Sequence, residues 1–190
     1  MKKNVAIFAS GSGSNAENII RYFHSDSDVS FPLILSNKTG AYVHQRAKAL
    51  GVPSVTFTKQ ELENGNLILS LLNDNKIDLI VLAGFLLKIP MYLITAYPNK
   101  IINIHPALLP KYGGKGMYGH YVHEAVVAAG EKESGITIHY VNEHYDEGNV
   151  IFQAKCELFP TDTAEDVAKK VHQLEYEYYP QVIRQLLKEM

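Results

Sequence analysis

The chain has 190 residues, of which 46% are hydrophobic and 20% are charged, and its formal net charge is −2. This composition is typical of a globular domain with a sizeable core, and so weak a charge gives no argument for nucleic acid or membrane partners. The single cysteine, Cys156, excludes internal disulfide bonds and suits a reducing compartment, so we expect a cytoplasmic protein.

Strand and helix patterns alternate along the first hundred residues. Apolar runs predict five strands, at 5–10, 31–36, 54–57, 79–83 and 101–104. Helical periodicity predicts helices over 16–23, 41–50, 62–73 and 86–96, with Pro90 in the first turns of the last. Strands that alternate with helices in this way favour a mainly parallel, doubly wound sheet.

The second half of the chain has a different pattern. Residues 136–141 and 150–158 predict two strands with antiparallel or mixed pairing, and a long helix is predicted over 164–188. Asp162 or Thr163 could cap that helix, and Pro180 should kink or divide it. The glycine-rich segment 112–123 cannot pack a core and is predicted to be a mobile surface loop, either a plain connection or a lid. With no repeat or linker, the whole chain reads as a single domain.

Asn103 and His105 are the first candidate functional residues. Side chains alternate along a strand, so both lie on one face, and Pro106 ends the strand just beyond them. Open α/β sheets bind ligands at the carboxyl ends of their strands. An amide donor beside an imidazole suits acyl transfer, which needs a donor to an oxyanion and a group that moves a proton near neutral pH.

A glycine turn at residues 11–15 lies between the first predicted strand and helix. A helix N-terminus offers free N–H groups to an anion, and glycines let a phosphate approach the backbone. The third glycine of the dinucleotide motif is absent and no Walker spacing is present, so dinucleotide binding is disfavoured. A tight turn with a capping serine is the alternative explanation.

Asp146 is the third candidate, in the loop beyond the predicted strand that contains His139. A carboxylate there could orient an imidazole, although a solvated acid before a glycine is the commoner reason for such a residue. The histidine spacing gives little support to a metal site.

Five motifs in this order resemble the phosphoribosylglycinamide formyltransferases, the folate-dependent family of purine synthesis, in its small monofunctional form. The motifs are S-G-S-G-S-N at 10–15, L-A-G-F at 82–85, N-I-H-P-A-L-L-P-K-Y at 103–112, G-I-T-I-H-Y-V from 135 and D-E-G at 146–148. The resemblance implies one Rossmann-like formyltransferase domain over 1–190, with a nucleotide-phosphate-binding half at 1–100 and a catalytic and folate-binding half at 101–190.

The resemblance also implies the reaction: transfer of the formyl group of 10-formyltetrahydrofolate to the amine of glycinamide ribonucleotide, without a metal, by a monomer or homodimer with small-molecule partners only. Asn103 would donate to the oxyanion, His105 would stabilise charge and move a proton, and Asp146 would orient His105 and a water. The nucleotide would contact Gly11, Ser12, Gly13, Ser14, Asn15 and Glu175. The folate would contact Leu86, Leu87, Lys88, Ile89, Asn103, Asn142, Glu143, His144 and Tyr145.

Three features depart from the family pattern. The loop 112–123 is longer and richer in glycine than in many relatives. The segment 59–66 has no arginine that could bind the glutamate tail of the folate, and Lys59 would have to take its place. His172 stands where relatives often have a basic or amide residue, and plain surface exposure is the alternative.

Other functions explain fewer residues. Methionyl-tRNA formyltransferase shares the N-x-H-P and D-x-G motifs, but an arginine-glycine-alanine step and a basic C-terminal domain are expected there, and this chain reads Tyr112-Gly113-Gly114. A formyltetrahydrofolate hydrolase would be expected to add an N-terminal regulatory domain. A noncatalytic nucleotide-binding module leaves Asn103, His105 and Asp146 unexplained, and an NAD oxidoreductase needs the missing third glycine.

Overall fold

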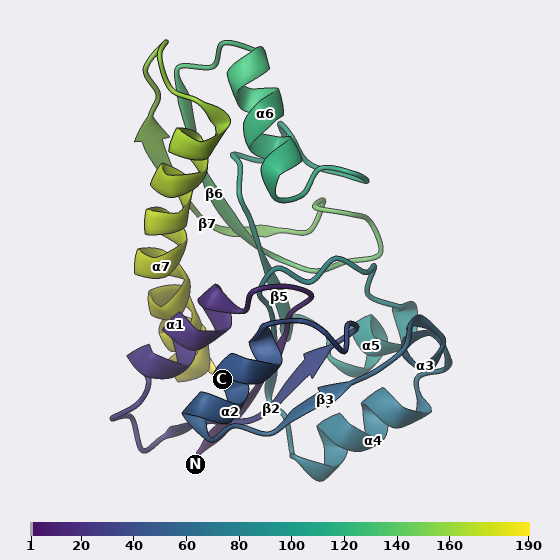
Figure 1. The fold of residues 1–190 in the computed structure, drawn as a ribbon. Helices are drawn as coiled ribbons and strands as arrows, with labels where there is room; N and C mark the ends of the chain where they lie inside the picture. Colours follow the sequence, from purple (N-terminus) through teal and green to yellow (C-terminus); the bar gives the residue numbers. More distant parts are fainter. Residues whose placement is uncertain (1) are drawn as a thin grey trace. The chain divides into compact units, whose positions relative to one another are not determined.

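The computed structural model describes residues 2–190, and its strands and helices alternate as predicted (Figure 1). The strands are β1 (Lys3–Phe8), β2 (Val29–Ser36), β3 (Ser54–Thr56), β4 (Leu79–Leu82), β5 (Ile101–His105), β6 (Glu133–Tyr140) and β7 (Val150–Glu157). The helices are α1 (Ser14–Tyr22), α2 (Val43–Leu50), α3 (Lys59–Asn64), α4 (Asn66–Asp74), α5 (Met91–Ala96), α6 (His120–Ala128) and α7 (Ala164–Glu189). The strand order β3-β2-β1-β4-β5-β6-β7 confirms the predicted fold class.

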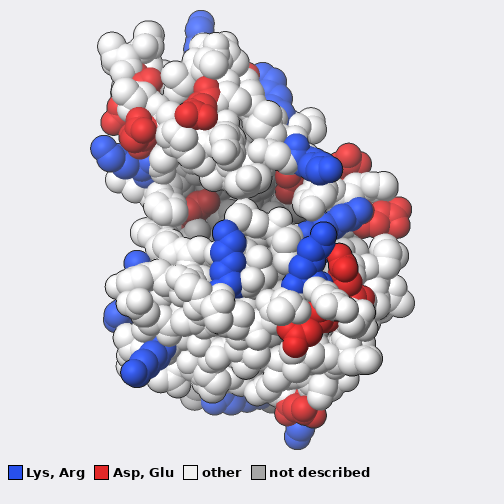
Figure 2. Space-filling view, turned by 45° about the vertical axis from the view of Figure 1, so that its right-hand side comes forward, with Lys and Arg blue, Asp and Glu red and all other residues white. Residues whose placement is uncertain are grey.

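The chain forms two compact units, and β5 belongs to both. The first unit runs up to Ile102 and includes the last two residues, and the second unit runs from Asn103 to Lys188. No helix of the described residues is both long enough and apolar enough to cross a membrane. On the face drawn in Figure 2, basic and acidic side chains are interspersed, as expected from the weak net charge.

The first unit is built around a parallel sheet with β1 between β2 and β4. Ala6 pairs with Leu33 of β2 on one side and with Ile80 of β4 on the other. Residues 5–9 are completely buried, which explains why β1 is a continuous apolar run and not an alternating one. On one side of this unit, α1 lies beside α2 (Figure 1).

Two predicted helices of the first unit were wrong in their bounds. The helix expected over 62–73 is divided into α3 and α4 at Gly65, whose φ is +79° and where an added Cβ would lie 2.8 Å from the Tyr92 ring. The helix expected over 86–96 begins only at Met91. Pro90 is its N-cap in an extended conformation. Proline disfavours helical backbone in the residue before it, so a helix that runs through Ile89 into Pro90 is unfavourable.

In the second unit, β6 and β7 pair antiparallel, as the sequence suggested. Helix α6 was missed: part of the segment predicted as a loop is helical from His120 onward. One face of this helix buries Val122, His123 and Val126, at the spacing of a helical stripe.

Thr163 caps the long helix α7. Its hydroxyl accepts from the N–H of Asp166 at 3.2 Å, and the Asp166 carboxylate accepts from the N–H of Thr163 at 3.0 Å. This reciprocal pair decides between the two predicted caps. The helix continues through Pro180 as one element, so of the predicted kink or division the division was wrong.

The segment that follows β5 is held in place by Thr137. This buried hydroxyl donates to the carbonyl of Ala107 at 2.7 Å and accepts from the N–H of Leu109 at 3.0 Å and from Gln153 Nε2 at 2.8 Å. Main-chain groups without a strand partner are thereby satisfied inside the protein.

We predict that Thr137→Val lowers the free energy of unfolding by roughly 2–4 kcal/mol, because a methyl group leaves the Ala107 carbonyl and the Leu109 N–H buried without a partner. Urea unfolding measures the change. Thr137→Ser is the matched control: it keeps the hydroxyl and loses one methyl, worth about 1 kcal/mol. Equal stability of the two variants would contradict this role.

Candidate functional site

Asn103, His105 and Asp146 come together in the second unit, with His139 as a fourth member. Nδ2 of Asn103 lies 3.2 Å from Nε2 of His139. Oδ1 of Asp146 lies 3.6 Å from Nε2 of His139. Oδ2 of the same carboxylate lies 3.6 Å from Nδ1 of His105. The four side chains therefore form a continuous polar chain at the end of β5.

Main-chain carbonyls determine which nitrogen of each histidine carries a hydrogen. Nε2 of His105 lies 2.7 Å from the carbonyl of Tyr112, and Nδ1 of His139 lies 2.9 Å from the carbonyl of Tyr140. A carbonyl can only accept, so both of these nitrogens are donors. The atom of His105 that gains or loses a proton is then Nδ1, which faces Asp146. In the tautomer with its single hydrogen on Nδ1, His139 accepts from Asn103 through Nε2.

Burial and charge act in opposite directions on the two titrating groups. Burial lowers the pKa of His105, and the nearby Asp146 carboxylate only partly offsets this. Burial by itself would raise the pKa of Asp146, but its interaction with His139, the charge of His105 and the N–H of Gly114 outweigh that effect and lower the pKa. The site thus holds a neutral imidazole next to an ionised carboxylate, which is the arrangement of a general base and its partner.

The glycine-rich segment supports Asp146 directly. The N–H of Gly114 donates to the Asp146 carboxylate at 3.0 Å, and Asp146 itself has a φ of +56°. A Cβ at Gly113 would lie 2.5 Å from Leu109, and one at Gly148 would lie 1.6 Å from the Tyr140 carbonyl. Only glycine allows these close approaches, so part of the segment predicted as a mobile loop is a support for the carboxylate.

His139 is the site residue that the sequence prediction missed. The sequence placed it in a strand, and the structure places it in β6 with 2% of its surface exposed. The sequence feature that could have identified His139 is the alternation of side chains along β6, which puts it on the same face as Thr137. The residues that His139 contacts, Asn103 and Asp146, lie in β5 and in the loop after β6. Contacts between residues so far apart in the chain cannot be predicted from a local sequence pattern.

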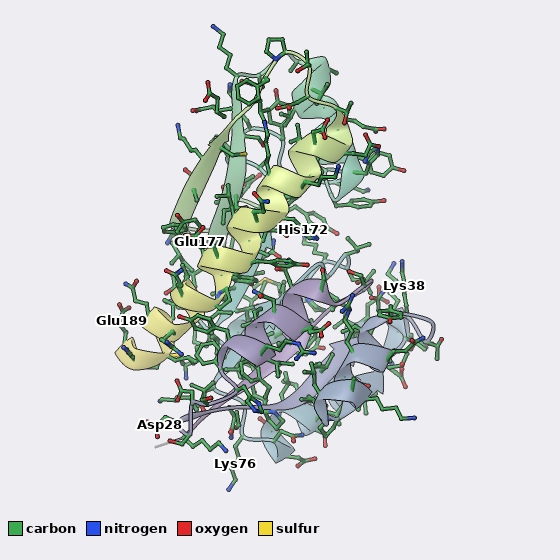
Figure 3. All side chains as sticks on the ribbon, turned by 60° about the vertical axis from the view of Figure 1, so that its left-hand side comes forward. Asp28, Lys38, Lys76, His172, Glu177 and Glu189 are labelled. Atoms are coloured by element: carbon green, nitrogen blue, oxygen red, sulfur yellow. The ribbon has the colours of Figure 1, made fainter. Side chains whose placement is uncertain are left out.

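Glu175 is a buried carboxylate on α7, with 6% of its surface exposed. Its Oε2 lies 2.5 Å from Nδ1 of His172, which lies on the same helix (Figure 3). This hydrogen bond raises the pKa of His172. His172 is half-exposed, as the surface alternative expected, but it also has this carboxylate partner.

The glycine turn, residues 11–15, lies in the first unit at the start of α1. Gly13 is the N-cap in a left-handed conformation and makes no side-chain cap, but the Ser12 hydroxyl accepts from the N–H of Ser14, the first residue of α1, at 3.4 Å, so a serine does bind the helix start. Ser10 precedes the turn, and its hydroxyl accepts from the N–H of Leu86 at 3.0 Å. This bond ties the turn to the segment 86–89, which is not helical and exposes Leu86 and Lys88.

The other predicted folate contacts lie in the second unit, between β6 and β7. Glu143, His144 and Tyr145 are exposed, and the Asn142 side chain accepts from the N–H of His144 at 2.9 Å. Within residues 2–190, no group of three or more histidine, cysteine, aspartate or glutamate side chains is arranged to hold a metal ion.

Comparisons with known proteins agree over the whole chain. Residues 3–183 match the family model described as formyl transferase. The chain is 40% identical to phosphoribosylglycinamide formyltransferase of Bacillus subtilis, over 97% of this chain and 95% of that protein. It is 38% identical to the chloroplastic enzyme of that name from Arabidopsis thaliana. That match covers 99% of this chain but only 66% of the plant protein, just under two thirds of its length. The crystal structure of phosphoribosylglycinamide formyltransferase from Anaplasma phagocytophilum superimposes with a TM-score of 0.90, at 32% identity, and covers 100% of this chain and 89% of that one.

We predict that Asp146→Asn moves the pKa of His105 further below its usual value. The substitution keeps the size of the side chain and removes the negative charge that favours the imidazolium, while the burial remains. An NMR titration of labelled imidazoles measures the shift. His172 is an internal control, because its pKa depends on Glu175 and should not move. An unchanged or higher pKa of His105 would refute the electrostatic coupling.

Proposed function

The chain belongs to the formyl transferase family, and we propose that it transfers the formyl group of 10-formyltetrahydrofolate to the amine of glycinamide ribonucleotide. The products are formylglycinamide ribonucleotide and tetrahydrofolate, in purine biosynthesis. The observation that carries the proposal is the polar chain of Asn103, His139, Asp146 and His105, which provides a neutral donor and a paired base.

Each side chain has a step in this reaction. The substrate amine attacks the formyl carbon, and the formyl oxygen takes up negative charge. Asn103 already directs one Nδ2 hydrogen to His139 and so has a second hydrogen for that oxygen. Nδ1 of His105 accepts the proton that the amine loses, and Asp146 stabilises the imidazolium. Release of that proton to the leaving nitrogen of the folate, through a water, restores the neutral imidazole.

Binding of the two substrates is also part of the proposal. The nucleotide phosphate lies on the N–H groups of the glycine turn, and its ribose contacts Glu175. The folate contacts the segment 86–89 and the residues 142–145. Two features support this: a left-handed glycine at the start of α1 in the first unit, and a buried carboxylate on α7 of the second. We place the reaction in the cytoplasm, in a monomer or homodimer that binds only small molecules.

One assay tests the proposed reaction. Purified protein is given 10-formyltetrahydrofolate, and tetrahydrofolate is measured with and without glycinamide ribonucleotide. We expect turnover that depends on the nucleotide. Release of tetrahydrofolate without it would identify a hydrolase, and no turnover in either case would refute formyl transfer.

We predict that Asn103→Ala lowers kcat by ~10²–10³, as the loss of one oxyanion donor typically does. Steady-state kinetics with both substrates measure the loss. Asn73→Ala is the control, since Asn73 is an exposed residue of α4 and should not affect turnover. Near-normal turnover of the Asn103 variant would exclude it as the oxyanion donor.

A further inference from the structure

The start of α2 contacts the back of the glycine turn at two consecutive peptide groups. The N–H of Val43 donates to the carbonyl of Gly11 at 3.2 Å. Nε of Arg46, one helical turn later, donates to the carbonyl of Ser12 at 2.9 Å. Neighbouring carbonyls of the turn are thus both bound by α2.

These two bonds determine where the N–H groups of the turn point. In a planar trans peptide the C=O and the N–H point in opposite directions. A Gly11 carbonyl directed at α2 therefore directs the N–H of Ser12 away from it, and the Ser12 carbonyl does the same for the N–H of Gly13. Successive N–H groups on one side of a turn form a concave site for an anion.

Gly13 allows α2 to come this close. Its φ is +71°, and an added Cβ would lie 2.4 Å from Cγ2 of Val43. Any side chain at this position would push α2 away from the turn and break the contact between Arg46 and Ser12.

Arg46 is itself held from two sides. Its guanidinium forms an ion pair with Glu17 in the first turn of α1 and lies 5.0 Å from the centre of the Tyr42 ring. Glu17 is bound by Arg21 as well, at 2.8 Å. A carboxylate so near the turn would repel a phosphate, and the two arginines together compensate for its charge. Of these two arginines, only Arg46 also bonds to the turn.

We propose that Arg46 is a positioning residue for phosphate binding: it holds the Ser12 carbonyl so that the N–H groups of the turn converge on the nucleotide phosphate. The inference rests on the proposed function, which assigns the turn to that phosphate. It adds a residue that touches no substrate and acts only through the backbone of the turn.

The test is Arg46→Met, which keeps an aliphatic stem over Tyr42 and removes every donor. We expect the Kd of glycinamide ribonucleotide by calorimetry, and its KM, to rise by about tenfold, because binding must then also order the N–H groups of the turn. The kcat and the KM for 10-formyltetrahydrofolate should not change. A residue that only supports the fold would instead alter both substrates or kcat together.

Two further variants separate the bond from the charge. Arg21→Met removes part of the charge that compensates Glu17 but leaves the bond to Ser12, so its affinity for the nucleotide should fall much less than that of Arg46→Met. Arg46→Lys keeps the charge but not the planar donor that reaches Ser12, so its affinity should stay well below normal. Full recovery with lysine, or an equal loss in the Arg21 variant, would overturn the positioning role.

The binding experiment also distinguishes this inference from the proposed function. If the unmodified protein binds neither glycinamide ribonucleotide nor inorganic phosphate, the proposed function fails and the role of Arg46 fails with it. If the unmodified protein binds the nucleotide and a Ser12→Ala, Asn15→Ala double variant weakens it, but Arg46→Met does not, only the inference about Arg46 is refuted.

Discussion

The candidate active site depends on one partly buried carboxylate, Asp146, that remains ionised. Removing such a charge from water costs several kcal/mol unless hydrogen bonds and opposite charge replace the lost solvation. Here the Gly114 N–H donates to the carboxylate, and His105, 3.6 Å away, supplies opposite charge when it gains a proton. Two glycines lie nearby: an added Cβ at Gly113 would lie 2.5 Å from the Leu109 side chain and 3.4 Å from Asp146, and at Gly148 the Tyr140 carbonyl leaves no room for a Cβ.

The main-chain carbonyls of Tyr112 and Tyr140 determine the tautomers of the two histidines. Each binds one nitrogen of one histidine and so assigns its hydrogen. Because the Tyr112 carbonyl occupies Nε2 of His105, proton transfer is restricted to the nitrogen beside Asp146. Because the Tyr140 carbonyl occupies Nδ1 of His139, the other nitrogen of this ring orients the Asn103 amide. Base and donor are therefore both oriented by main-chain groups.

The sequence predicted what depends on local periodicity. Alternation along β5 placed Asn103 and His105 on one face, and the order of strands and helices predicted the parallel sheet. Two errors in the predicted helices have local causes. Pro90 was placed inside a helix that begins after it, and α6 was hidden by the glycines before it. His139 gains its place in the site from partners that no window of sequence contains.

In each unit, a side chain binds main-chain groups and thereby determines the direction of the neighbouring backbone. In the first unit, Arg46 binds the Ser12 carbonyl and thereby directs an N–H outward. In the second, Thr137 binds main-chain groups of Ala107 and Leu109 just after the strand that ends in His105. A glycine turn and a polar strand end are recognisable motifs, but their geometry is set by these residues behind them. Specificity in such a site therefore extends to side chains that never touch the substrate.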